Sequence, residues 1–393
     1  MGICFIFNWS ETSMEKIYLD HAATSPLHPK VIAKMTDAFT TFGNPSSIHS
    51  FGREARKHLD DARTTIAASI GANRNEIIFT SSGTEADNLA IIGTAHARKE
   101  FGKHIITTEI EHPAVLQTCR YLEKEGFEVT YLPVDKTGMI SVKEFEKVLR
   151  EDTILVTIMF GNNEVGTLLP VKEIGEILTN HQAYFHTDAV QAYGVQKINV
   201  NDLYVDLLSV SAHKINGPKG VGFLYMRDGT KLVPTLYGGE QELKRRAGTE
   251  NLHAIVGFAT AVEVSQQKLE KRQQQYRQLK QQFIHSLRDN DITFHINGNE
   301  EHSLPHVLNI SFTGIKHLEA MLVQLDMNGI AASSGSACTA GTVEYSHVLS
   351  AMFGQQSERL NNSIRFSFGL NNTEAQIIQA VHVITDIVHR LQK

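Results

Sequence analysis

The stretch Glu76-Ile-Ile-Phe-Thr-Ser-Ser-Gly-Thr-Glu85 decides the fold class of this chain. Its residues 76–80 predict a strand, residues 81–84 a turn of small side chains, and residues 85–98 a helix. Further apolar strands are predicted at 103–108, 128–132, 153–159, 183–186, 207–210 and 221–226, and helices separate most of them. This alternation indicates an α/β fold in which a mostly parallel sheet carries helices on both faces.

The regions that flank this alternating core differ from it. Residues 1–13 are expected to be an extension outside the fold, because Met14 opens a more ordinary N-terminus. A long helix from residue 258 to about residue 287, followed by short strands and helices, predicts a smaller α+β domain. We therefore divide the rest of the chain into a segment 14–28 that packs with the small domain, a large domain 29–262 and a small domain 263–393.

The composition excludes several classes of protein. The 393 residues are 41% hydrophobic and 20% charged, as in ordinary globular proteins, and the net charge of −6 gives no case for direct nucleic-acid binding. No segment is apolar over a membrane-spanning length, so no membrane contact is expected. The three cysteines, Cys4, Cys119 and Cys338, lack CxxC spacing, which argues against a disulfide framework or metal site and for the reducing cytoplasm.

Residues suited to ligand binding follow successive predicted strands. Gly83 and Thr84 lie at a helix N-terminus, where free backbone N–H groups bind phosphate, although an ordinary helix cap formed by Thr84 and Glu85 is the alternative. His112 offers a flat ring for stacking on an aromatic cofactor, or else caps a helix. Asp188 offers a carboxylate for a protonated ring nitrogen, and here too a helix cap is the alternative.

Lys214 ends the predicted strand 207–210 and begins a loop rich in glycine and proline. A single lysine is usually solvated, but a lysine at a strand end beside a cleft can become a nucleophilic amine. Together with the three preceding sites, it completes the contacts that pyridoxal phosphate requires at its phosphate, ring face, ring nitrogen and aldehyde. The amides and glycines of residues 160–166 suggest further ligand contacts, or a turn.

At this point the sequence resembles the group I cysteine desulfurases, the NifS/IscS type, which are fold type I, class V aminotransferase-like enzymes. The resemblance extends from Met14 to the C-terminus and implies a large domain with a mostly parallel seven-stranded sheet and a small α+β domain. It rests on Tyr18-Leu-Asp-His-Ala-Ala-Thr24, Gly43-Asn-Pro-Ser-Ser47, Ser82-Gly-Thr-Glu-Ala-Asp-Asn88, Glu111-His112, Asn162-Asn-Glu164, Asp188-Ala-Val-Gln191, Ser211-Ala-His-Lys214, Arg246-Ala-Gly-Thr249, Ser333-Ser-Gly-Ser-Ala-Cys-Thr339 and Ile364-Arg-Phe-Ser367.

The resemblance implies a role for each candidate residue. Lys214 would bind the cofactor aldehyde, His112 would stack on the ring, and Asp188 would pair with the ring nitrogen. The remaining implied contacts are those of Gln191 with the phenolic oxygen, of Gly83, Thr84, Ser211 and His213 with the phosphate, of Thr249 with the phosphate of the partner subunit in a homodimer, and of Asn163 and Arg365 with the substrate carboxylate.

Cys338 would be the nucleophile that takes sulfur from L-cysteine, leaving alanine and a persulfide. Its setting of small polar residues has no apolar pattern that would bury it, whereas Cys119 lies in a helical apolar pattern and is expected in the core. The persulfide would pass to an acceptor protein, either an iron–sulfur scaffold or a tRNA thiolation enzyme. Lys214, Asp188 and Cys338 argue against a non-catalytic scaffold, and Cys338 argues against a class V aminotransferase; selenocysteine lyase activity is a further alternative.

Overall fold

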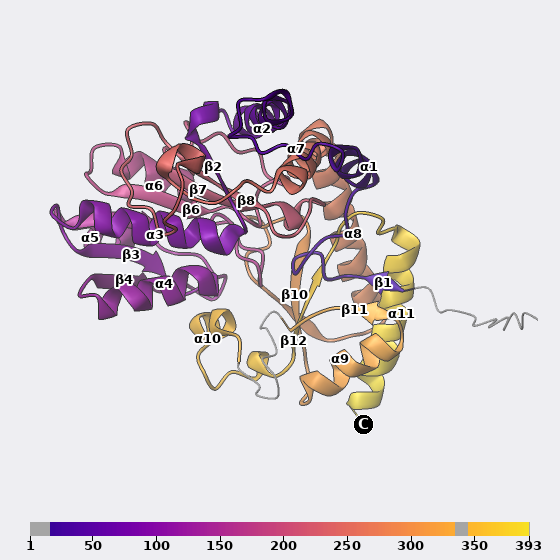
Figure 1. Ribbon diagram of the computed structural model, residues 1–393. Coiled ribbons are helices and arrows are strands. Elements are labelled where there is room, and N and C mark those ends of the chain that lie inside the picture. Colours follow the sequence, from indigo (N-terminus) through magenta and orange to yellow (C-terminus); the bar gives the residue numbers. More distant parts are fainter. Residues whose placement is uncertain (1–15, 335–344, 393) are drawn as a thin grey trace, which may run out of the picture.

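The computed structural model describes residues 16–334 and 345–392 and has two parts (Figure 1). The larger part contains a seven-stranded sheet with helices around it, and the smaller part contains a three-stranded sheet and the C-terminal helix. The predicted fold class is therefore confirmed. The expected extension 1–13 and Cys338 lie outside the described residues.

The seven-stranded sheet follows the predicted strands closely. Its strands, in spatial order, are β2 (Ile77–Thr80), β8 (Gly222–Met226), β7 (Leu207–Ser211), β6 (Tyr184–Asp188), β5 (Thr153–Thr157), β3 (His104–Thr108) and β4 (Glu128–Leu132). Six of the seven strands run in the same direction, and β8 alone in this sheet is antiparallel to both of its neighbours. The connection between β7 and β8 is too short for a crossover helix, which explains the reversal.

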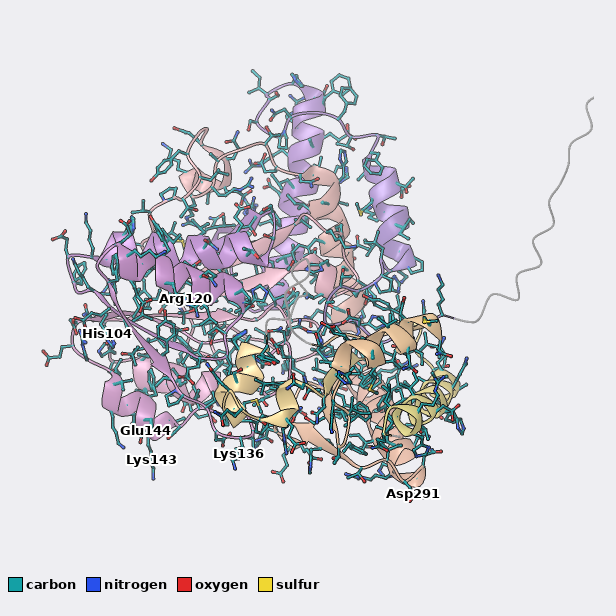
Figure 2. The ribbon with its side chains drawn as sticks, turned by 90° about the horizontal axis from the view of Figure 1, so that it is seen from below. His104, Arg120, Lys136, Lys143, Glu144 and Asp291 are labelled. Atoms are coloured by element: carbon teal, nitrogen blue, oxygen red, sulfur yellow. The ribbon has the colours of Figure 1, made fainter. Side chains whose placement is uncertain are left out.

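Helices cover this sheet, and helix α3 crosses five of its strands. Helices α1 and α2 both pack against α7 (Figure 1). The helices of the larger part are α1 (Pro29–Ala38), α2 (Ser50–Ser69), α3 (Gly83–Arg98), α4 (Pro113–Lys124), α5 (Val142–Val148), α6 (Val171–Leu178) and α7 (Leu252–Gln267). On the outer surface Lys136, Lys143 and Glu144 point into solvent (Figure 2).

The smaller part is built on an antiparallel sheet in the order β12 (Ser363–Ser367), β10 (Val307–Phe312), β9 (Phe294–Asn297). The ring of Phe283 lies against Phe366 and Phe368 in its core, with ring centroids 4.7 and 5.9 Å apart. Its helices are α8 (Leu269–Asp289), α9 (Leu318–Met327), α10 (His347–Phe353) and α11 (Glu374–Leu391).

The N-terminal segment lies against this smaller part. Strand β1 (Ile17–Tyr18) pairs in parallel with β11 (Ile330–Ala331), and Ser367 N donates to Leu19 O at 2.7 Å. Backbone pairing of this kind satisfies buried polar groups at both ends of the chain. The start of the described chain is therefore held by residues near its end.

The prediction of a single helix from residue 258 to residue 287 is wrong. The chain breaks at Lys268 (φ −122°, ψ 14°), where α7 ends and α8 begins. Helix α7 is buried on most sides against α1 and α2, whereas α8 buries only one stripe, which includes Tyr276, Leu279 and Phe283. The two helices serve different cores, so the chain turns between them, and the proposed domain boundary at residue 262 falls inside α7.

Candidate active site

A cavity of about 350 Å³ lies at the carboxyl ends of the parallel strands, where ligands bind in open α/β sheets. It contains side chains from both parts of the chain. The predicted residues that line it are Gly83, Thr84, His112, Asn163, Asp188, Gln191, Ser211, His213, Lys214 and Arg365. Thr249 is exposed and does not line this cavity, and Cys338 is outside the described residues.

The N-terminus of α3 forms one wall of the cavity. Ser82, rather than Thr84, caps this helix, because its Oγ accepts the N–H of Glu85 at 3.2 Å. Thr84 is exposed and lines the cavity. A Cβ atom on Gly83 would lie 2.7 Å from Val190 Cγ2, so only glycine fits beside this strand end. The free N–H groups of the first helical turn can therefore approach a bound anion closely.

His112 lies at the start of α4 and at the edge of the cavity. Its Nδ1 accepts the N–H of Ala114 at 3.1 Å and thereby caps α4, while its ring lines the cavity. Burial lowers the pKa of His112, and the charge of Lys214 lowers it further against the opposing effect of Asp188. A largely neutral, flat ring is thus presented to the cavity.

Asp188 ends β6, and its Oδ1 accepts the N–H of Val190 at 2.9 Å. Its side chain is buried, and this burial raises the pKa of Asp188, while His112 and Lys214 act against the rise. A carboxylate placed so deeply gains most from a nearby cation, which a protonated ring nitrogen would supply. No helix follows Asp188, since residues 190–192 form a turn, so the helix-cap alternative is wrong, and Asp188 lines the cavity.

Two further polar residues lie around Asp188 that the sequence did not reveal. Asp87 of α3 lines the cavity, is buried, and its Oδ1 lies 3.6 Å from His186 Nε2. Burial, and then the charge of Asp188, raise the pKa of Asp87 well above its ordinary value. Burial lowers the pKa of His186 to about 3. Its two ring nitrogens form hydrogen bonds with the hydroxyl groups of Thr157 and Ser209. Besides His112 and Lys214, Asp188 therefore has two buried neighbours, Asp87 and His186, whose charged forms are disfavoured.

Lys214 projects into the cavity from the turn that follows β7. Its Nζ donates to the carbonyl oxygens of Ala22 and Ala23, the latter at 2.8 Å. Burial lowers the pKa of Lys214 to about 8, with a smaller contribution from the positive charge of Arg365. An amine with this pKa is partly unprotonated near neutral pH, which makes it suitable for covalent and proton-transfer chemistry.

Arg365, on β12 of the smaller part, also lines the cavity. Its Nη2 donates to Asp20 Oδ1 at 2.9 Å and its Nη1 to the carbonyl oxygen of Asn163 at 2.9 Å. Its buried Nε has no hydrogen-bond partner among the described residues. The guanidinium is thus held rigidly and keeps a donor available, a geometry suited to a carboxylate. Asp20, which orients it, was not singled out from the sequence.

The three remaining predicted contacts also lie at this cavity. Gln191 donates through Nε2 to Ala22 O at 2.9 Å, and His213 Nδ1 lies 3.1 Å from Thr24 Oγ1. Burial, and then Lys214, lower the pKa of His213 to about 4. Ser211 lies opposite Gly83, since a Cβ on that glycine would be 3.5 Å from Ser211 Cβ. The polar N-terminal loop therefore forms one side of the site.

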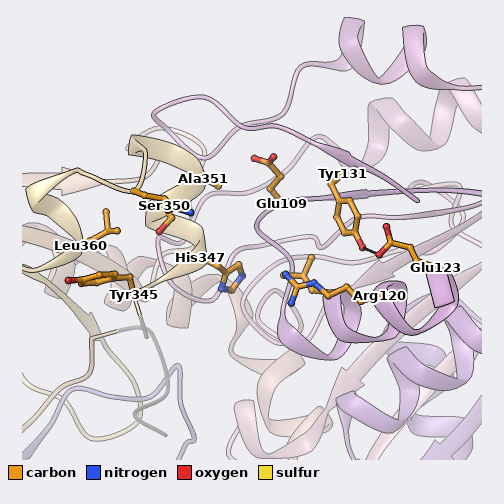
Figure 3. Close-up of a pocket in the computed structure, with 11 residues that line it drawn as sticks. Glu109, Arg120, Glu123, Tyr131, Tyr345, His347, Ser350, Ala351 and Leu360 are labelled. Carbon is orange, nitrogen blue, oxygen red and sulfur yellow. Dashed lines mark hydrogen bonds between the residues drawn. The ribbon is translucent and has the colours of Figure 1, made fainter. Parts of the chain in front are cut away.

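A larger hollow of about 850 Å³ lies next to the cavity, between the larger part and helix α10 (Figure 3). Arg120, Glu123 and Tyr131 line it from α4 and β4, and Tyr345 and His347 line it from the opposite side. His347 Nε2 bonds the carbonyl oxygen of Glu111 at 2.9 Å. The chain that follows the Cys338 segment is thus fixed to the larger part.

Within the described ranges, no cluster of three or more His, Cys, Asp or Glu side chains has metal-binding geometry. No helix among the described residues is both long and apolar enough to cross a membrane. Cys119 is fully buried in α4, as predicted for a core residue, and burial raises its pKa.

Comparisons with known proteins show the family of this chain. The model of the class-V aminotransferase family matches residues 17–380. A putative cysteine desulfurase IscS 1 of Bacillus subtilis (strain 168) is 60% identical over 379 residues, which are 96% of this chain and 100% of the relative. The chain belongs to the NifS/IscS-type group of the class-V aminotransferases. Pyridoxal phosphate is the cofactor of these enzymes, so the predicted cofactor and family are confirmed.

Two solved structures support this assignment. A NifS-like protein aligns with a TM-score of 0.89 at 36% identity and covers 96% of this chain and 100% of its own. A structure described as SspA in complex with cysteine aligns with a TM-score of 0.77 at 36% identity, covering 90% of this chain and 99% of its own. The fold of the class-V family is therefore shared over nearly the whole chain.

The residues of the cavity fit pyridoxal phosphate. The first turn of α3 offers free N–H groups and the Thr84 hydroxyl to a phosphate, and Gly83 allows the close approach. Asp188 offers a buried carboxylate, and the buried amine of Lys214 has a lowered pKa. The phosphate, the ring nitrogen and the aldehyde of the cofactor would thus each meet a group of suitable chemistry, namely N–H donors, a carboxylate and an amine.

Proposed function

We propose that this protein is a cysteine desulfurase that uses pyridoxal phosphate to remove sulfur from L-cysteine, leaving L-alanine and a persulfide on Cys338. The observation that carries the proposal is the convergence in one cavity of Lys214, Asp188 and His112 with the rigidly held Arg365. The 60% identity to a putative cysteine desulfurase and the 36% identity to a protein solved with cysteine support the choice of substrate.

In this proposal the residues of the larger part hold the cofactor. Lys214 would hold its aldehyde carbon, His112 its ring face, Asp188 its ring nitrogen and Gln191 its phenolic oxygen. The phosphate would bind Ser211, His213, Gly83 and Thr84. Pyridoxal phosphate, when bound, supplies an electron sink for the substrate's α-carbon. The hydrogen bonds from Lys214 Nζ to the carbonyl oxygens of Ala22 and Ala23 support a role of the N-terminal loop in orienting this amine.

Arg365 and Asn163 would bind the carboxylate of L-cysteine. Asp20 and the Asn163 carbonyl already orient two nitrogens of the guanidinium, so little rotamer freedom is lost when substrate binds. The lowered pKa of Lys214 lets its amine accept the α-proton of the substrate and return it. Both groups line one cavity, so together they would fix the orientation of the amino acid.

Cys338 would attack the sulfur atom of the substrate as a thiolate. A sulfur–sulfur bond forms while the carbon–sulfur bond of the substrate breaks. The electron pair of the broken bond stays with the substrate carbon, which takes up a proton and leaves as alanine. His347 and Ser346 hold the chain after this segment to Glu111 and Glu164, which supports a reach of Cys338 toward the cavity.

We also propose that two copies of the chain form a homodimer in which Thr249 contacts the cofactor phosphate of the partner. Large apolar side chains are exposed at 61% to 91% on segment 39–51, namely Phe39, Phe42 and Ile48, and Tyr237 is 79% exposed. One hollow is lined by Ser46 and by residues 240–243, so the two segments are neighbours. Exposed apolar surface of this extent favours a protein–protein interface.

The sulfur acceptor would be another protein of the cytoplasm, an iron–sulfur scaffold or a tRNA thiolation enzyme. Tyr345, which lines the larger hollow, follows the Cys338 segment in the sequence. The hollow carries charges of both signs, Arg120 with Glu109 and Glu123, and these suit a polar protein surface. Persulfide transfer from the loaded enzyme to each purified candidate, followed by mass spectrometry, would identify the acceptor.

The central test is the product of the reaction with L-cysteine. With a thiol reductant the enzyme should release equal amounts of alanine and sulfide, and without reductant Cys338 should gain the mass of one sulfur atom. Cys338→Ala should lose that adduct while it keeps the absorbance of the bound cofactor. Alanine production by Cys338→Ala at the wild-type rate would refute the nucleophile, and no alanine from the wild type would refute the function.

A further inference from the structure

A strained segment connects β8 to α7 and carries Thr249. Three consecutive residues of this segment, Glu242, Leu243 and Lys244, have left-handed backbone angles, with φ of 46°, 56° and 66°. Residues other than glycine adopt this region rarely and only where the surroundings impose it. Contacts elsewhere must therefore hold the segment in this shape.

One of these contacts is a buried ion pair with α2. Both carboxylate oxygens of Glu242 lie 2.7 Å from guanidinium nitrogens of Arg63, and Oε2 also accepts the N–H of Phe79 at 2.9 Å. The side chain of Glu242 is 1% exposed. The start of the segment is thus fixed to α2 and to strand β2 of the central sheet.

A second ion pair fixes the segment to the phosphate-binding end of α3. Arg246 donates through Nε to Glu85 Oε1 at 2.7 Å and through Nη2 to Glu85 Oε2 at 3.2 Å. The same Glu85 accepts the N–H of Ser81 at 2.8 Å and donates its own N–H to Ser82 Oγ. Glu85 therefore joins Arg246 to the first turn of α3, whose residues Gly83 and Thr84 line the cavity.

Thr249 follows Arg246 by three positions in the sequence. Between them Gly248 adopts a φ of +104°, a conformation that L side chains rarely adopt, and its N–H donates to Gln241 Oε1 at 3.1 Å. Thr249 itself is exposed. The segment thus presents one residue to the site of its own subunit and another to its surroundings.

We propose that Arg246 is a positioning residue for both phosphate sites of the dimer. Through Glu85 it fixes the first turn of α3 in its own subunit, and through the turn at Gly248 it sets the position of Thr249 for the partner. The second part rests on the proposed function, in which Thr249 binds the partner's phosphate.

The charge of Arg246 matters as well as its geometry. Without Arg246 the carboxylate of Glu85 would stand unpaired beside the helix end that receives the phosphate, and like charges would repel. Replacing Glu85 by glutamine removes this repulsion and keeps an acceptor for the Ser81 N–H. The double substitution should therefore recover affinity in the same subunit but leave the partner's site impaired.

Mixed dimers separate the two effects. One subunit carries Lys214→Ala and cannot contribute to the visible absorbance of the lysine-bound cofactor, so only the other subunit reports. Arg246→Gln is placed either in the reporting subunit or in the silent one, and the dissociation constant of pyridoxal phosphate is measured from that absorbance. We expect weakening of about fivefold or more in both placements, the size of a lost helix cap.

The controls are matched to neighbouring residues. Arg245→Gln removes an arginine that donates to Asn75 O rather than to Glu85, and it should change affinity in neither placement. Thr249→Ala should weaken binding only from the silent subunit. Circular dichroism and the thermal midpoint of each dimer verify folding, and Glu85→Gln paired with Arg246→Gln serves as the second variant.

The outcomes distinguish this proposal from the proposed function. The two-site role is overturned if Arg246→Gln changes the dissociation constant of pyridoxal phosphate in neither placement or in only one of them. If Thr249→Ala weakens binding from the silent subunit while Arg246→Gln does not, the dimeric site stands and the positioning role falls. If Thr249→Ala has no effect in either placement, the contribution of the partner fails, and the two-site role fails with it.

Discussion

Replacing Arg63 by alanine should destabilise the protein strongly, although Arg63 lies outside the cavity. Its guanidinium makes two 2.7 Å bonds to Glu242 and lies 4.6 Å from the ring centroid of Phe79. The side chains of the pair are only 11% and 1% exposed. After Arg63→Ala the Glu242 carboxylate would remain buried with no cation beside it.

The size of the effect follows from this burial. Removing one partner of a buried ion pair costs about 3–5 kcal/mol, because the remaining charge is desolvated without compensation. Most of this cost comes from the stranded carboxylate, so Glu242→Gln in the Arg63→Ala background should recover part of it. The amide can still accept the N–H of Phe79, as the carboxylate does at 2.9 Å.

Urea denaturation at one fixed protein concentration measures this difference, with Arg150→Ala as the matched control. Arg150 also bonds two carboxylates, Glu128 and Asp152, but these side chains are 44% to 67% exposed. Solvent screens such pairs, so the control should shift the denaturation midpoint much less. Hydrogen exchange at Phe79 N–H gives a local readout, which should accelerate in Arg63→Ala.

Two results would refute this reasoning. A loss of stability below about 1 kcal/mol for Arg63→Ala would place the pair among surface ion pairs, despite its burial. A double variant less stable than Arg63→Ala alone would show that the stranded charge is not the source of the cost. In either case the left-handed segment would be held by contacts other than this pair.

Three other substitutions test the carboxylate site, the anchor of the small domain and a buried acid. Arg365→Lys should raise the KM for L-cysteine about tenfold or more, since an ammonium cannot form the fork; unchanged kinetics contradict the assignment. Ser346→Ala, which loses the bond to Glu164, should slow persulfide formation seen by mass spectrometry at unchanged cofactor absorbance, and an equal rate would make this anchor dispensable. Burial raises the pKa of Glu111 from 4.5 to about 8. The folded state therefore binds this proton more tightly than the unfolded state. The free energy of unfolding should decrease as the pH rises from 4.5 to about 8. Urea titrations of Glu111→Gln should show a flatter dependence, and an unaltered slope would exclude Glu111 as its source.

Much of the fold followed from the sequence, because strands buried on both faces give continuous apolar runs and helices end at glycine or proline. The reversed direction of β8 could not be read from its own residues, since they form the same continuous apolar run as the parallel strands of the sheet. The break at Lys268 was missed for a related reason. Apolar spacing continues across that residue, and only the presence of two separate cores makes the chain turn there.

Lys214 and Asp188 were predicted to lie at one site, and the cavity contains both. Residues that act through these were not found, because Asp20 and Asp87 resemble any other acid in the sequence. The cap and ligand interpretations of His112 were presented as alternatives, yet its side chain caps α4 and also lines the cavity, whereas Asp188 is followed by a turn and caps no helix. The role of Ser82 as the cap of α3 depends on a backbone geometry that composition does not specify.

The pairing of the N-terminal segment with the end of the chain has a consequence for biosynthesis. Ala22 N donates to Ser367 Oγ at 2.8 Å across 345 positions of sequence, and Asp20 holds Arg365. Residues 17–24 emerge from the ribosome early, but their partners Arg365 and Ser367 emerge only when translation is nearly finished. A nascent or truncated chain therefore lacks the complete cavity, to which Arg365 belongs. Reactive sulfur would then not be produced before the whole polypeptide is made. Contacts of such long range also make this closure a slow step of folding.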